Sequence, residues 1–174
     1  WRVNNEAGVL GSLAPPVTRL PSRVYVPGNL VEGLSTEWSN AGRGLQLQAS
    51  SGQPGRLEGS PTSGFRAQTG HISSMGTQLD SAPWQLAARL TRADQISLLD
   101  TPVLPSDLLN AQSAQVSVRR EQDALSLQAN LITTRASNVS GQHSGVWLDG
   151  GWKQGSGNYS WGLYWLDTDL SWAG

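Results

Sequence analysis

The stretch that decides the fold is "AQVSVRREQDALSLQANLITT", residues 114–134. Apolar and polar residues alternate along both of its arms, and a repeat of two residues is the pattern of a β-strand with unlike faces. A polar turn at 121–123 separates the arms, so the stretch predicts a β-hairpin. The apolar face of this hairpin consists of Ala114, Val116, Val118, Leu125, Leu127, Ala129 and Leu131.

The same alternation appears on both sides of this hairpin. "GLQLQAS" (44–50), "PWQLAARLTR" (83–92) and a second predicted hairpin at 145–166 all repeat every two residues, and helical spacing is absent from this half of the chain. We therefore predict an all-β protein, an antiparallel up-and-down meander of about eight or nine strands over residues 36–174. Residues 1–35 contain four prolines, which interrupt strand ladders, and are expected to form an irregular lead-in or linker.

Composition narrows the class of protein. Charged residues make up 14% of the chain, against about 25% in an ordinary soluble domain. The net charge of −1 implies no strong electrostatic attraction to nucleic acid, and the absence of cysteine excludes disulfides and thiolate metal sites. No apolar run approaches the roughly 18 residues of a transmembrane helix. A transmembrane β-barrel remains open, because its strands alternate over only about 10 residues at a time.

A strand with one apolar and one polar face suits two surroundings. In a soluble sandwich the apolar face points into the core, whereas in an outer-membrane barrel it meets lipid and the polar face lines the lumen. Three features favour the barrel. The polar faces carry Gln, Arg, Ser, Asn and Thr with little Lys or Glu; the apolar faces carry Leu, Val, Ala and Trp with little Phe or Ile; and Trp and Tyr occur near strand ends.

Long alternating hairpins with Gly, Asn and Ser turns, as in "SGVWLDGGWKQGSGNYSWGLYWLD" (144–167), resemble Gram-negative outer-membrane β-barrel proteins. The likeness extends over residues 36–174, matches no family-specific motif, and is similar in texture to usher barrels, porins and polysaccharide-export barrels. It implies a segment of a large barrel in the bacterial outer membrane, surrounded by lipid. It further implies a pore, usher or export role for a transported polypeptide or glycan, without catalysis. The ending "SWAG" leaves the pattern unfinished, so further strands are expected.

The barrel interpretation assigns side chains to two surfaces. Arginines and amides of the polar faces are expected to line the lumen, and Arg135 is placed on or near the same faces. The lumen-facing set is Arg66, Arg89, Arg119, Gln128 and Asn130. The aromatic residues expected at the membrane interface are Trp147, Trp152, Tyr159, Trp161, Trp165 and Trp172.

Few residues suggest chemistry. Asp167 and Asp169, with Asp149 on a nearby strand, offer oxygens to a calcium ion, but no EF-hand spacing supports such a loop, and a turn at the strand end explains them more simply. His143 precedes Ser144, and adjacent strand residues point to opposite faces, so they form no nucleophile–base pair. We therefore expect no enzyme, no metal and no cofactor.

Two other interpretations stay open. One is a soluble β-sandwich that binds carbohydrate through exposed Trp and Tyr, and a weaker one is a structural repeat of a surface adhesin. The sandwich and the barrel differ in the surroundings of the apolar faces. A sandwich buries Leu125, Leu127, Leu131, Trp161 and Trp165, whereas a barrel leaves them facing lipid.

Overall fold

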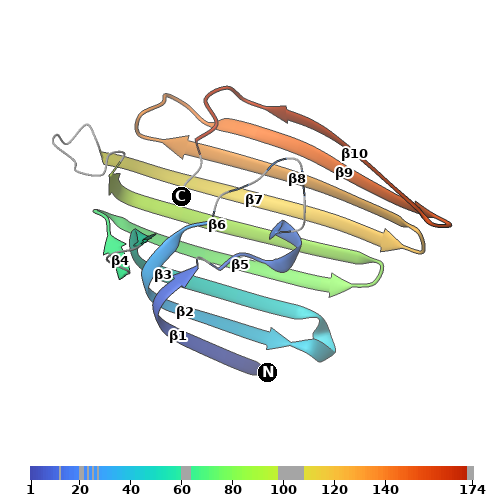
Figure 1. Ribbon diagram of the computed structural model, residues 1–174, viewed down its shortest axis with the longest axis horizontal. Coiled ribbons are helices and arrows are strands. Elements are labelled where there is room, and N and C mark those ends of the chain that lie inside the picture. The colour runs from blue at the N-terminus through green and yellow to red at the C-terminus, as the bar shows by residue number, and fades with distance from the viewer. Residues whose placement is uncertain are drawn as a thin grey trace.

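The computed structural model describes residues 1–11, 13–19, 22, 24, 26, 28–59, 64–97 and 108–171. It contains one ten-stranded antiparallel sheet (Figure 1) and two single-turn 3₁₀ helices, η1 (Pro16–Arg19) and η2 (Ala41–Arg43). None of the helices in the described part is long and apolar enough to cross a membrane. The strands are β1 (Arg2–Gly11), β2 (Leu30–Asn40), β3 (Leu45–Glu58), β4 (Gly64–Ala67), β5 (His71–Ser81), β6 (Trp84–Ser97), β7 (Leu108–Gln122), β8 (Leu125–Ala136), β9 (His143–Gln154) and β10 (Gly157–Leu166).

The strands follow one another through the sheet in chain order, as Figure 1 shows. The short β4 is the exception, because it pairs with the far end of β3 while β5 pairs with the remainder of that strand. Within the described residues β1 pairs only with β2 and β10 only with β9, so the sheet is open and does not close into a barrel. The predicted all-β, antiparallel up-and-down meander is confirmed.

The hairpin at residues 114–134 forms as predicted. β7 and β8 pair from Gln122↔Leu125 onward, leaving Asp123 and Ala124 as a two-residue turn. Asp123 has a φ of 53°, a left-handed conformation that two-residue hairpin turns require and that Asp tolerates. This turn fixes the register, which in turn places Val116 opposite Leu131 on the same face.

The N-terminal region differs from the irregular lead-in expected over residues 1–35. Arg2–Gly11 forms the full-length strand β1, which pairs with β2 at ten positions, and β2 itself begins at Leu30. Eight strands, β3 to β10, begin within residues 36–174, where eight or nine were expected, and β1 and β2 bring the total in the described residues to ten. The alternation is weak in β1, since Asn4 and Asn5 are neighbours, and backbone pairing with β2 holds the strand in place. The prolines all follow it in the chain.

The sheet has two unlike faces. We call the face of Leu127 and Leu131 the apolar face and that of Gln128 and Asn130 the polar face. Leu127 and Leu131 are 36% and 44% exposed, whereas Gln128 and Asn130 are 6% and 3% exposed. The distribution is therefore the reverse of a water-soluble sheet, in which the apolar face is covered. A small cluster of apolar residues packs at one end of the polar face: Val31, Ile72, Ala93, Leu109, Ala111 and Ala136.

On the apolar face an aromatic ring lies against a glycine. Trp161 of β10 is opposite Gly150 of β9, and a Cβ added to Gly150 would overlap the indole ring. Rings that cover glycines of neighbouring strands help to fix strand register. Gly150 therefore provides the space in which Trp161 lies flat on the sheet.

We predict that Gly150→Ala lowers the free energy of unfolding by about 1–3 kcal/mol, because the new methyl group must displace the ring. The measurement is urea unfolding followed by tryptophan fluorescence. Gly11→Ala is the matched control, since a Cβ at Gly11 meets nothing within 4 Å, and its effect is expected within about 0.5 kcal/mol. Equal effects of the two substitutions would contradict the contact.

Candidate functional site

We call side chains of the polar face inward and those of the apolar face outward. The register arranges the inward side chains in rows that run across the strands. One row consists of hydroxyl residues on six neighbouring strands, each opposite the next: Ser35, Ser50, Ser74, Thr91, Ser113 and Thr134. Ser50 Oγ and Ser74 Oγ lie 2.7 Å apart within it. All but the half-buried Ser113 are buried. Such a row is a wall of small hydrogen-bonding groups.

A parallel row carries amides and an indole. Ser117 Oγ donates to Asn130 Oδ1 at 2.7 Å, and Gln128 Nε2 donates to the same oxygen at 3.1 Å. Trp147 is opposite Asn130 on β9 and only 3% exposed. The indole Nε1 of Trp147 and the Nδ2 of Asn130 are buried without a partner among the described residues. The polar face therefore has two buried hydrogen-bond donors without an acceptor among the described residues.

A segment between β1 and β2 lies across this face, and we call residues 13–19 the strap. Figure 1 shows its helix η1 in front of the sheet, where it contacts β6 and β7. The backbone amide of Val17 donates to Gln78 Oε1 at 2.9 Å, and Gln128 Nε2 donates to the carbonyl of Val17 at 3.0 Å. Pro15 lies so close to Gly76 that a Cβ there would be 2.9 Å from its ring. The strap is therefore held by side chains of β5 and β8.

The structure brings most of the predicted lumen-facing residues together. Arg89, Gln128 and Asn130 are buried on the polar face, and Arg119 lies there bonded to Glu121 and, at 3.5 Å, to Gln128. The remaining two predicted arginines lie elsewhere. Arg66 is exposed on β4 and pairs with Glu58 at 2.9 Å, outside the rows. Arg135 is exposed and lies opposite Gln112 with the side-chain direction of Leu131, on the apolar face.

The predicted interface aromatics also divide. Four of them are exposed on the apolar face: Trp152, Tyr159, Trp161 and Trp165. Trp147 differs, because it lies between the outward Val146 and Leu148 and so points to the polar face, where it is buried. Trp172 lies outside the described residues.

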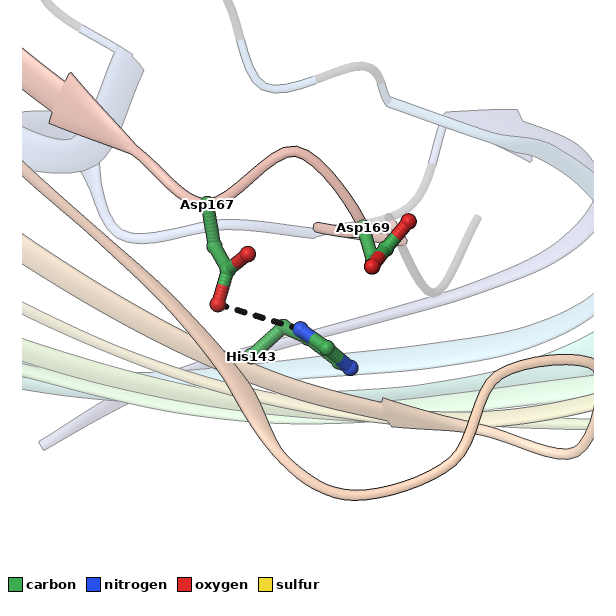
Figure 2. Close-up of side chains that lie close together, drawn as sticks. All are labelled: His143, Asp167 and Asp169. Atoms are coloured by element: carbon green, nitrogen blue, oxygen red, sulfur yellow. Dashed lines mark hydrogen bonds and ion pairs between the residues drawn. The ribbon is translucent and has the colours of Figure 1, made fainter.

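At one end of β9 and β10 a histidine contacts a carboxylate (Figure 2). His143 Nδ1 lies 3.1 Å from Asp167 Oδ2, and its Nε2 lies 3.0 Å from the carbonyl oxygen of Ser140. Both partners only accept hydrogen bonds, so the contacts are both satisfied when the ring is protonated. The hydrogen bond to Ser140 and then the bond and charge of Asp167 raise the pKa of His143, with Asp169 adding a smaller effect in the same direction.

The sequence suggested that Asp149 could lie beside Asp167 and Asp169. In the structure His143, and not Asp149, lies beside them. Ligand atoms of His143, Asp167 and Asp169 lie within 4.8 Å of one another, but the contact between His143 and Asp167 accounts for their proximity without an ion. Asp149 instead accepts a hydrogen bond from Ser22 Oγ at 2.7 Å. Asp167 and Asp169 follow the end of β10 in a turn, as the simpler alternative proposed.

Sequence reasoning missed a serine–histidine contact. Ser51 Oγ and His71 Nε2 lie 2.7 Å apart on neighbouring strands, both with the side-chain direction of the apolar face. Only the register of β3 against β5 reveals this pair, since 20 residues separate the two in sequence. A hydrolytic triad also needs a group that orients the other ring nitrogen. No such hydrogen bond to His71 Nδ1 forms among the described residues.

Comparison with models of known protein families, with characterised proteins and with solved structures finds no match for the chain.

The strap contacts make a first prediction for the site. Gln78→Ala removes the acceptor of the buried Val17 amide, so this amide should exchange with solvent about tenfold faster, the effect of about 1.4 kcal/mol for one buried hydrogen bond. The measurement is site-resolved hydrogen exchange. Gln46→Ala is the control, because Gln46 is opposite Gln78 on β3 and does not bond to the strap. Unchanged exchange at Val17 in the Gln78 variant would contradict the anchoring.

A second prediction concerns His143, the first residue of β9. It lies before the apolar side chains of that strand, which begin at Val146. Because the pKa of His143 is raised, the charge contribution of the His143–Asp167 contact is present at pH below the ordinary histidine pKa and is lost as the pH rises through the raised value. Asp167→Asn should lower the pKa of His143 toward its ordinary value in an NMR titration. Asp123→Asn, in the turn between β7 and β8 at the opposite end of the strands, should leave it unchanged.

Proposed function

We propose that this chain forms part of the wall of a bacterial outer-membrane β-barrel. Its apolar face meets membrane lipid, and its polar face lines a passage with a pore, usher or export role and no catalysis. The passage suits a hydrophilic cargo, a polypeptide or a glycan, because its wall offers hydroxyl, amide and guanidinium groups.

The single observation that carries this proposal is the exposure of the apolar face. Large apolar side chains on nine strands share that face, and most are between 36% and 65% exposed. Soluble monomers rarely expose apolar patches beyond a few hundred Å². Two described segments that cover the sheet, the strap and residues 167–171, lie on the opposite face, so lipid is the medium that suits the apolar face.

The height of the apolar face supports the same conclusion. On β6 the outward residues are apolar from Trp84 to Leu90, six residue steps or about 20 Å along the strand, and the next outward residue is Arg92. The apolar band of a membrane barrel is about 25 Å tall, with aromatic residues at its borders. Trp84, Trp152 and Tyr159 lie at one border of this band.

The open edges of the sheet have a consequence in lipid. Unpaired backbone groups at β1 and β10 would each cost several kcal/mol in a bilayer, where no water can bind them. We therefore propose that both edges pair with further strands in the intact barrel. Those strands belong either to the same chain or to another copy, and this choice sets both the number of strands per chain and the oligomeric state.

A carbohydrate-binding module is the second candidate, because the aromatic rings of β9 and β10 are exposed. The rings of Trp152 and Tyr159 lie 5.9 Å apart but are inclined by 37°, and the neighbouring outward residues are leucines. A sugar-binding platform presents coplanar rings to a pyranose face, which this pair does not. A cooperatively folded, detergent-free monomer that binds glycan would favour this alternative.

The membrane proposal is tested by a charge placed at two heights of one strand. Leu131→Arg puts a cation between Val116 and Val146, inside the apolar band of β8, where it costs about 2–4 kcal/mol, and insertion into lipid vesicles should fall accordingly. Thr133→Arg, on the same face beside Arg135, is the control, with a cost of about 0–1 kcal/mol. Insertion is measured by protection from protease after mixing with vesicles. Equal insertion of both variants, or a protein that stays in water, would overturn the proposal.

A further inference from the structure

The apolar face carries two adjoining hollows where β3, β5 and β6 meet. One, of about 520 Å³, is lined by apolar and small side chains, among them Trp38, Leu47, Thr77 and Ala88. The other, of about 700 Å³, is lined by Arg92, Gln112 and Arg135 among others. Ala49, Met75 and Leu90 line both, so the hollows are continuous.

The shape of the apolar hollow follows from the register. Thr77 and Ala88 are opposite one another, between the larger Leu47 on β3 and Val116 on β7. Small side chains between larger neighbours leave a depression in the sheet surface. A depression of this volume and apolar lining suits a flexible hydrocarbon chain better than a charged group.

The second hollow has a cationic rim. Arg92, Gln112 and Arg135 are consecutive in one row across β6, β7 and β8, so the two arginines are two strand spacings, about 10 Å, apart with the amide between them. Arg92 pairs with Asp94 through Nε, at 2.8 and 2.9 Å, which leaves the donors of its terminal nitrogens available. Arg135 has no ion pair within the described residues. Two arginines against one aspartate leave one net positive charge.

We propose that these hollows form a binding site for a lipid with an anionic phosphate headgroup. The acyl chain occupies the apolar hollow, and the phosphate accepts hydrogen bonds from Arg92, Arg135 and the Gln112 amide. Charge complementarity selects this occupant, because arginine forks match phosphate oxygens and the row lies just beyond the apolar band, at headgroup height. The inference rests on the proposed function, since it requires the apolar face to meet lipid.

The test compares lipid retention in mixed vesicles of phosphatidylcholine with a minor share of phosphatidylglycerol. After extraction in mild detergent, the phosphatidylglycerol retained per protein is measured by mass spectrometry. The double substitution Arg92→Gln with Arg135→Gln should reduce its enrichment by about fivefold for each arginine. Arg43→Gln with Arg120→Gln is the control, because it removes the same charge at the opposite end of the strands and should change little.

Two further experiments test the apolar hollow and the arginine row separately. Ala88→Trp fills the apolar hollow without changing charge and should also reduce the enrichment. Inorganic phosphate at the lipid concentration should not displace the lipid, because it cannot use the apolar hollow. Displacement by phosphate, or equal enrichment in the arginine variant and its control, overturns the lipid site alone. A wild-type protein that does not enter vesicles overturns both the site and the proposed function.

Discussion

The constraint on which the structure depends is the two-residue repeat of a hydrogen-bonded strand. Antiparallel pairing fixes each backbone, and the pleat then sends successive side chains to opposite faces. Once the turn at Asp123 and Ala124 sets the register of β7 against β8, Leu131 of one strand is opposite Val116 of the other. The same rule repeated across the sheet separates an exposed apolar face from a buried polar one.

The polar face depends on the same register in a second way. Because residues of matching direction are opposite one another, single serines and threonines scattered over a hundred residues become a continuous row of hydroxyls. The strap then uses the neighbouring amides, and its backbone groups at Val17 are satisfied by Gln78 and Gln128. A buried backbone amide without such a partner is costly, so the position of the strap is specified by these side chains.

The sequence predicts the fold well where the alternation is strict and poorly where pairing alone makes the strand. β7, β8, β9 and β10 follow from their patterns, whereas β1 does not, because its adjacent asparagines hide the repeat. The alternation with Leu127, Ala129 and Leu131 predicts that Gln128 and Asn130 lie on the polar face, and the structure places them there. Trp147 was grouped with the other aromatics by residue type, although its position between Val146 and Leu148 determines the opposite direction. The strap, the Ser51–His71 contact and the hydroxyl row are long-range consequences of register, which no local pattern contains.

The central claim is that the apolar face, and not the polar face, contacts lipid. Two variants test it, each keeping one of the eight tryptophans and replacing the others with phenylalanine. One variant keeps the outward Trp161, which is 47% exposed, and the other keeps the inward Trp147, which is 3% exposed. In vesicles of brominated lipid, the fluorescence of Trp161 should be strongly quenched and that of Trp147 little changed. Quenching of Trp147 in preference to Trp161, or quenching of neither, would contradict the account.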